Sequence, residues 1–210
     1  MMPSTHSAGG VTELEVAEEI AAGFREGGTD TVTFTLVASG PNGAFPHHHT
    51  GGRVLQEGDA VVIDIGGSRA GYASDLTRMV FVGESTDRYR EVHAVVEAAV
   101  QAALGAARPG ATAGDVDAAA RDVIDAAGYG AYFVHRTGHG LGMSVHEPPW
   151  IMRGSDHVLR EGTGHSLEPG IYLQGEFGIR LEEIVFLTAD GCEAFSALPP
   201  YMPECRSRAA

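Results

Sequence analysis

The sequence predicts an α+β fold in which one unit, a helix followed by strands, occurs twice. Segment 10–16 (GVTELEV) returns one hundred residues later as segment 110–116 (GATAGDV). In both segments a threonine stands three residues before an acidic residue, which is the spacing of the capping box that starts a helix. Short runs rich in apolar and β-branched residues follow both helices and favour strands. We therefore expect two similar halves.

The first half is expected to begin with a helix that starts at Thr12, where Glu15 completes the capping box. Apolar residues recur along it at helical intervals, and Gly27 and Gly28 mark its end. The residues of this apolar face are Leu14, Ala17, Ile20, Ala21 and Phe24.

Strands are expected next, at residues 31–38 and 60–65. The eleven residues from Asp64 to Asp75 leave enough chain for a turn at Gly71 and Tyr72 and an antiparallel return. The two carboxylates would then converge.

Residues 87–107 predict a long amphipathic helix between the halves, with a packing function. Its expected buried face consists of Tyr89, Val92, Val96, Ala99 and Ala103.

The second half repeats the pattern with a helix that starts at Thr112, uses Asp115 for its capping box and ends near Gly128. Strands are expected at residues 171–172 and 183–187. In the segment GIRLEE, strand alternation places Arg180 and Glu182 on one face and Glu183 on the other.

Five potential metal ligands occur in short motifs spread over the last two-thirds of the chain. Taken singly, each motif is weak, because an aspartate after an apolar run is often a strand-end cap and Glu-Pro-Gly is often only a turn. Together, four carboxylates and one imidazole suit two hard divalent cations better than a single zinc. The ordered set predicts a two-metal hydrolase site. Its members are Asp64 (VVIDIGG), Asp75 (YASDLTR), His139 (HRTGHGLG), Glu168 (SLEPGIY) and Glu182 (GIRLEE).

These motifs make the chain from Gly10 to Ser196 resemble the catalytic domain of the aminopeptidase P, prolidase and creatinase family, the pita-bread metallopeptidases. The resemblance implies the pita-bread fold, in which two halves face each other about a pseudo-two-fold axis with the metals between them. It also implies ligand roles: Asp64 is a terminal ligand of one metal and Asp75 and Glu182 bridge both metals. His139 and Glu168 complete the other metal site.

The resemblance also places a substrate pocket. His47, His135, Arg180 and Tyr172 match its substrate-binding positions, and His146, Glu168 and His135 match its catalytic positions. Alternatives remain for several of them. His47 opens a run of three histidines, so the register could slip to His48; Tyr172 could be a core aromatic residue, and His135 and His146 could be ordinary loop histidines. Four further histidines are expected to lie outside the site, namely His48, His49, His157 and His165.

The chemistry implied by the resemblance is hydrolysis of the Xaa-Pro bond of dipeptides or short peptides by a metal-bridging hydroxide. Glu168 would accept the proton, and His146 would stabilise the oxyanion. Two divalent metal ions are implied, manganese first because the ligands are mostly oxygen, with cobalt or zinc as substitutes. Two alternatives are a non-catalytic or weakly active peptide-binding homologue and a related amide hydrolase with a non-proline substrate.

Length and composition add further expectations. The 210 residues are expected to form a single catalytic domain, with residues 1–9 as a tail and without the N-terminal domain of full-length family members. That expected absence leaves the choice between dipeptides and longer peptides open. A formal net charge of −14 argues against nucleic acid and anionic membranes as partners.

The remaining expectations concern location and assembly. No apolar run approaches the ~20 residues of a membrane span, so we expect a cytoplasmic protein. Cys192 and Cys205 lie in no metal-binding or redox motif and are expected to be unreactive. The resemblance allows a homodimer, and it implies as partner a peptide with proline at its second position.

Overall fold

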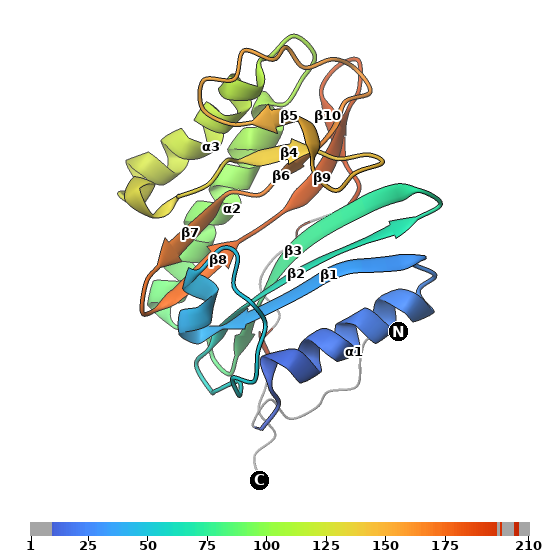
Figure 1. Ribbon diagram of the computed structural model, residues 1–210. Helices are drawn as coiled ribbons and strands as arrows, with labels where there is room; N and C mark the ends of the chain where they lie inside the picture. Colours follow the sequence, from blue (N-terminus) through green and yellow to red (C-terminus); the bar gives the residue numbers. More distant parts are fainter. Residues whose placement is uncertain (1–9, 197, 199–203, 206–210) are drawn as a thin grey trace.

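The first half of the molecule is a helix lying on a mostly antiparallel sheet, as Figure 1 shows in blue and cyan. The computed structural model describes residues 10–196, 198 and 204–205, so the expected tail at 1–9 lies outside them. The sheet has the order β1-β2-β3-β11. Its elements are α1 (Glu13–Glu26), β1 (Thr31–Ser39), the 3-10 helix η1 (Gly40–Ala44), β2 (Ala60–Arg69), β3 (Tyr72–Val82) and β11 (Glu204–Cys205).

The hairpin of β2 and β3 is longer than the sequence indicated. β2 continues four residues beyond the expected end at Ile65, and the turn lies at Ala70 and Gly71, one residue earlier than expected. Both turn residues have positive φ, 52° and 83°, as a tight two-residue hairpin turn requires. The expected antiparallel return is confirmed, because Asp75 pairs with Gly66, two residues after Asp64.

The second half contains a five-stranded sheet of order β10-β9-β6-β4-β5 and a separate two-stranded ribbon, β7-β8. Most of these strands are only three to five residues long, which explains why sequence periodicity indicated just two of them. The elements are α3 (Ala113–Ala126), the 3-10 helix η2 (Gly130–Tyr132), β4 (Gly138–Gly140), β5 (Glu147–Ile151), β6 (Gly164–Leu167), β7 (Gly170–Leu173), β8 (Phe177–Arg180), β9 (Glu183–Leu187) and β10 (Cys192–Ala194).

The duplicated helix starts are confirmed at the level of single hydrogen bonds. Both α1 and α3 begin with a complete capping box, at Thr12 and Thr112. Each threonine also forms an isolated antiparallel bridge to a valine, Val54 in the first half and Val158 in the second. The starts of α1 and α3 are therefore held by the same pattern of backbone contacts.

The long helix α2 (Asp87–Ala106) packs against α3 and supplies the main apolar core between the halves (Figure 1). All five residues expected on its buried face are buried, from Tyr89 to Ala103. A smaller cluster under α1 includes Ala17, Val37 and Val61. Within the part of the chain that the structure describes, the search for membrane spans found no helix both long and apolar enough to cross a bilayer.

The expectation that Arg180 and Glu182 share one strand is wrong. β8 ends at Arg180 and β9 begins at Glu183, so Glu182 lies in the two-residue link between them. The link exists because the chain changes sheets here: β8 pairs with β7, whereas β9 pairs with β6 and β10. Sequence alternation within one strand cannot reveal such a crossing.

Candidate metal centre

The first half contributes Asp64 and Asp75 from neighbouring strands of one hairpin. Asp64 Oδ2 accepts a hydrogen bond of 2.6 Å from the guanidinium of Arg180, which reaches across from the second half. Asp75 is buried, with 6% of its surface exposed. Because both aspartates sit on a rigid paired ladder, their carboxylates are held in place before any ligand arrives.

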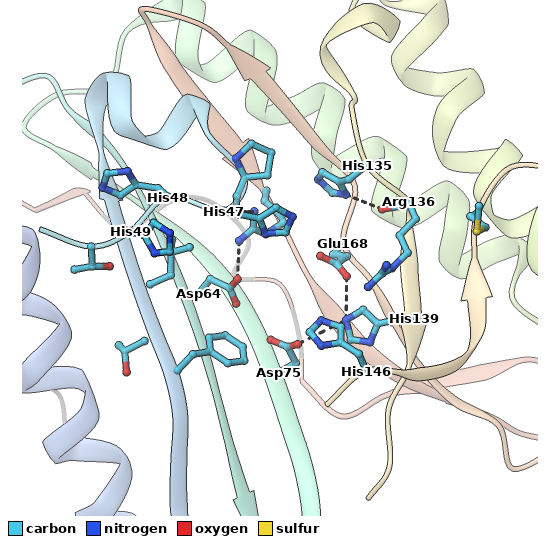
Figure 2. A pocket seen from close by; sticks show the side chains of 17 residues that line it. His47, His48, His49, Asp64, Asp75, His135, Arg136, His139, His146 and Glu168 are labelled. Atoms are coloured by element: carbon cyan, nitrogen blue, oxygen red, sulfur yellow. Dashed lines mark hydrogen bonds and ion pairs between the residues drawn. The ribbon is translucent and has the colours of Figure 1, made fainter. Parts of the chain in front are cut away.

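The second half contributes His139 and Glu168, which face the hairpin in Figure 2. His139 Nδ1 donates to the carbonyl of Gly140 at 3.1 Å, which leaves Nε2 as the nitrogen that faces the carboxylates. That nitrogen lies 3.2 Å from Glu168 Oε1 and 3.7 Å from Asp75 Oδ2. The hydrogen bond to Gly140 therefore orients the ring so that a potential metal-binding nitrogen points at the carboxylates.

Ser166 on β6 orients both of these side chains. Its hydroxyl accepts from the backbone N–H of His139 at 3.0 Å and donates to Glu168 Oε1 at 3.1 Å. Such a close approach of β4 to β6 depends on Gly138, where a Cβ atom would lie 1.9 Å from the Ser166 carbonyl oxygen. The glycine before His139 is thus required by packing.

Glu182 reaches the centre from the link between β8 and β9. Its Oε2 accepts a hydrogen bond of 2.8 Å from Thr77, which lies on β3 two residues after Asp75. Its neighbour Glu183 is turned away and is held by Arg78 at 2.6 Å. Arg78 also donates to the backbone carbonyl of Glu182 at 2.5 Å, which fixes the link.

Potential ligand atoms from the two halves gather within 4.8 Å of one another in three overlapping groups. Within the described part of the chain, one oxygen of each of three carboxylates is buried without a hydrogen-bond partner, on Asp64, Asp75 and Glu182. Buried carboxylate oxygens normally have partners, so these atoms indicate a cation site. The donor set fits two divalent ions. The groups are Asp64, Asp75 and Glu182; His139, Glu168 and Glu182; and Asp75, His139 and His146.

The electrostatics of the cluster agree with that fit. Burial, followed by the charges of Asp64 and Glu168, raises the pKa of Asp75 to about 8. Burial and the neighbouring carboxylates also raise the pKa of Glu182 well above its usual value. Four carboxylates in one buried space repel each other, and positive ions would relieve this repulsion.

The cluster lies at the floor of a cleft of about 730 Å³ between the halves (Figure 2). His47, His135 and His146 line this cleft, as expected from the sequence. The expectation that His48 and His49 lie outside the site is wrong, because both line the cleft together with His47. The structure also adds lining residues that sequence reasoning left out. These are Arg136 beside His135, Met152, and Phe34, Thr35 and Leu36 on β1.

Comparison with known proteins identifies the family. The sequence pattern of metallopeptidase family M24 matches residues 2–189. The chain belongs to the M24 metallopeptidases. The probable dipeptidase PepE of Mycobacterium tuberculosis is 49% identical over 191 residues, which cover 90% of this chain and 51% of that protein. The Xaa-Pro dipeptidase of Lactobacillus delbrueckii subsp. lactis is 46% identical, covering 89% of this chain and 51% of that protein.

Solved structures show the same relationship. The prolidase of Thermococcus sibiricus superposes with a TM-score of 0.92 and 41% identity, covering 95% of this chain and 55% of that one. The dipeptidase PepE of Mycobacterium ulcerans gives a TM-score of 0.92 with 45% identity over 94% of this chain and 54% of that one. These likenesses confirm the expected pita-bread fold. The chain spans about half the length of the relatives it matches.

In this M24 chain, His135 has both ring nitrogens engaged. Nδ1 donates to the Arg136 carbonyl at 2.7 Å, and Nε2 lies 2.7 Å from the hydroxyl of Tyr172. Burial lowers the pKa of His135 to about 4, so the ring is neutral and Nε2 accepts from the tyrosine. Tyr172, in turn, accepts a hydrogen bond of 3.0 Å from Arg180. Tyr172 is 3% exposed and stands behind His135, away from the cleft surface.

His146 differs from His135 because it is exposed. Its ring centroid lies 4.2 Å from that of His139, at the edge of the cluster. Partial burial, then the proximity of His139 and Arg136, lowers the pKa of His146 and favours the neutral ring. This position allows two chemical roles, either a hydrogen bond to a substrate or a place in the Asp75–His139 ligand group.

Proposed function

We propose that the chain is the catalytic part of a metal-dependent exopeptidase that hydrolyses the Xaa-Pro bond of dipeptides or short peptides. The observation that carries this proposal is the convergence of Asp64, Asp75, His139, Glu168 and Glu182 from both halves, with unpartnered buried carboxylate oxygens among them. The names of the relatives, Xaa-Pro dipeptidase and prolidase, support the choice of substrate.

The proposed metal ligands are those five residues, with Asp75 and Glu182 in the bridging roles that the family resemblance implies. Both are carboxylates that belong to two ligand groups and that have a buried oxygen without a partner in the described part of the chain. Manganese is the proposed metal, since oxygen donors outnumber nitrogen donors; cobalt and zinc are substitutes. A bound pair of divalent ions would supply Lewis acidity and lower the pKa of water to about 7.

The proton acceptor in this proposal is Glu168. Burial by itself raises its pKa, but the hydrogen bond with His139 and the charge of Arg180 outweigh burial and lower it. The carboxylate is therefore ionised at neutral pH and can take a proton from attacking water. His146, neutral and at the cleft surface, is placed to donate a hydrogen bond to the oxygen on which negative charge develops.

The other cleft residues shape the substrate pocket. With both nitrogens of His135 occupied, we assign it to pocket shape and not to proton transfer. Arg180 donates to Asp64, Tyr172 and the carbonyl of Pro46. These contacts engage its guanidinium, so we assign Arg180 to orienting these residues and not to binding a substrate carboxylate. His47 forms the opposing wall, beside Asp64 in Figure 2.

The test is hydrolysis of Ala-Pro, Ala-Pro-Gly and Ala-Ala by metal-free protein with and without added manganese. We expect metal-dependent cleavage of the proline peptides, much slower cleavage of Ala-Ala, and no turnover by Glu168→Gln. Equal rates on Ala-Ala would favour the amide hydrolase with a non-proline substrate. Peptide binding without cleavage in the presence of bound metal would favour the non-catalytic homologue.

A further inference from the structure

Glu13 is a fully buried acidic residue at the start of α1, outside the metal centre. Its exposed fraction is 0%, whereas the other glutamates near the start of this helix are exposed. A buried carboxylate is costly unless several donors satisfy it. The partners of Glu13 therefore show what the protein gains from placing a charge there.

Five hydrogen-bond donors converge on this one carboxylate. Oε1 accepts from the backbone N–H of Ser39 at 2.7 Å, from the Ser39 hydroxyl at 2.8 Å and from the side-chain amide of Asn42 at 2.9 Å. Oε2 accepts from His48 Nε2 at 3.1 Å and from the backbone N–H of Gly51 at 3.4 Å. These donors belong to the end of β1, to η1 and to the segment 46–51, which we call the histidine loop.

The histidine loop forms one wall of the cleft. Pro46 and all four residues from His47 to Thr50 line the cleft. Along the run, His47 and His49 are exposed while His48 between them is only partly exposed. Figure 2 shows His47 next to Asp64 and His48 farther from the metal centre. The contact between His48 and Glu13 thus holds His48 as the less exposed histidine of the run, between the exposed His47 and His49.

The rest of the loop is attached at its two ends. Thr50 Oγ1 accepts from the backbone N–H of Val37 at 2.8 Å, and the carbonyl of Pro46 accepts from Arg180 at 3.3 Å. In the middle of the loop, the backbone N–H of His48 donates to the carbonyl of Phe45 at 3.1 Å. Glu13 provides the side-chain contact there, through His48, and so helps to fix the orientation of this part of the loop.

The internal duplication indicates that the helix start itself does not need this carboxylate. In the second half, Ala113 occupies the equivalent first position of α3, is also 0% exposed and makes the equivalent backbone hydrogen bond. Glu13 N donates to Arg53 O at 2.9 Å, and Ala113 N donates to His157 O at 2.9 Å. Alanine therefore suffices for the framework. The carboxylate of Glu13 is an addition specific to the half that carries the histidine loop.

We propose that Glu13 is a positioning residue for the substrate cleft, which holds the histidine loop so that His47 and His49 face the substrate. The proposal rests on the proposed function for the meaning of the cleft, but the loop contacts stand without it. Glu13 touches neither the ligand cluster nor the cleft surface, so its effect on substrate passes through His48 and the loop.

The test variant is Glu13→Ala, because alanine already occupies the equivalent position of the repeat. The control is Glu18→Ala, which replaces an exposed residue of the same helix. Hydrogen exchange measured by mass spectrometry should rise in segment 39–51 of Glu13→Ala, with α3 and the β2–β3 hairpin unchanged. Metal content should equal that of the wild type. On Ala-Pro, KM should rise roughly tenfold with kcat changed much less, as expected when a residue contributes to binding alone.

A second variant, His48→Leu, removes the partner on the loop without touching α1 and should give the same local rise in exchange. If Glu13→Ala fails to fold, His48→Leu still tests whether the contact between Glu13 and His48 holds the histidine loop. Unchanged exchange in segment 39–51, or a rise spread evenly over the molecule, would overturn the proposal. If the wild type cleaves no proline peptide, the proposed function fails while the exchange experiment still tests the role of Glu13.

Discussion

Asp75 lies at the point where the two halves meet, and its environment makes the centre sensitive to its replacement. It belongs to two of the three ligand groups, it is buried, and one of its oxygens lacks a partner within the described part of the chain. Replacing it removes a carboxylate that both proposed metal ions share. The loss should then affect both ions at once.

We expect Asp75→Asn and Glu182→Gln to lose both metal ions. Affinity should fall by more than the roughly 10–100-fold that removal of an outer partner costs. An amide has only one oxygen and cannot replace a carboxylate that bridges two ions. Glu168 belongs to one ligand group only, so Glu168→Gln should retain part of its metal through that oxygen, while turnover collapses because the basic group is gone. Elemental analysis of dialysed protein and a parallel Ala-Pro assay measure both effects. Two equivalents of metal in Asp75→Asn would refute the bridging role.

His146→Ala separates the two roles that its position allows. If His146 stabilises developing negative charge, kcat should fall by about 10²–10³ while metal content is unchanged. His165→Ala is not a suitable control because that residue is buried, so the exposed His157→Ala serves instead. Metal loss in proportion to the loss of activity would instead make His146 a ligand.

At the level of elements, the approach of β4 to β6 holds His139 in place. We expect Gly138→Ala to destabilise the protein by about 1–3 kcal/mol or more, because the added Cβ would overlap the Ser166 carbonyl and overpacking carries this cost. Metal affinity should fall as well, since Ser166 also orients His139 and Glu168.

Gly105→Ala in α2 is the matched control, because no atom lies within 4 Å of its Cβ position. This substitution should stabilise the helix by up to about 1 kcal/mol. Urea denaturation of both variants, each with and without manganese, gives the comparison. Equal stability of the two variants would contradict the close packing of β4 on β6.

The elements that the sequence predicted well are those specified by neighbouring residues. The capping boxes at Thr12 and Thr112 depend on contacts three residues apart, and the hairpin that carries Asp64 and Asp75 is local too. The link that carries Glu182 was missed, because its geometry arises from a change of sheets.

Glu13 was missed for a similar reason. In sequence it looks like one more glutamate at a helix N-terminus, and only the fold brings donors from segment 39–51 onto it. Its burial depends on contacts 26 to 38 residues away. By contrast, the ligand residues could be selected from their motifs, because family resemblance supplies the long-range information that local pattern lacks.

On the scale of the whole molecule, the metal centre joins the two halves. Asp64 and Asp75 come from the first half, and His139, Glu168 and Glu182 come from the second. A metal ion that binds only the folded chain raises the free energy of unfolding by about 2.7 kcal/mol when the free metal concentration is 100 times Kd. We expect the melting temperature to rise continuously with manganese concentration. A melting temperature independent of manganese would show that no such site forms.

Without metal, stability should fall as pH rises from about 7 to 8. In this range the folded protein still binds a proton at Asp75, whose pKa is raised to about 8, while the unfolded chain, with an aspartate pKa of about 3.9, has released it. His135 and His165 oppose this fall below about pH 7, because their folded pKa values are lowered to about 4 while the unfolded rings, with a pKa of about 6.5, still bind protons there.

One such carboxyl group lowers the free energy of unfolding by at most about 1.4 kcal/mol per pH unit. Glu182, whose pKa is also raised, changes it in the same direction. Asp75→Asn should therefore show a flatter dependence than the wild type. Urea denaturation in chelator at several pH values measures this, and equal slopes in the two proteins would contradict the raised pKa of Asp75.

The span of the ligands along the chain has a consequence for protein synthesis. A growing polypeptide presents the hairpin with Asp64 and Asp75 before any ligand of the second half, and these two side chains can approach each other without a later segment. Glu182 and the strand that follows it emerge more than one hundred residues after Asp75. A nascent chain that has not yet reached Glu182 therefore cannot assemble the complete cluster, so the proposed centre forms only after the second half has been synthesised.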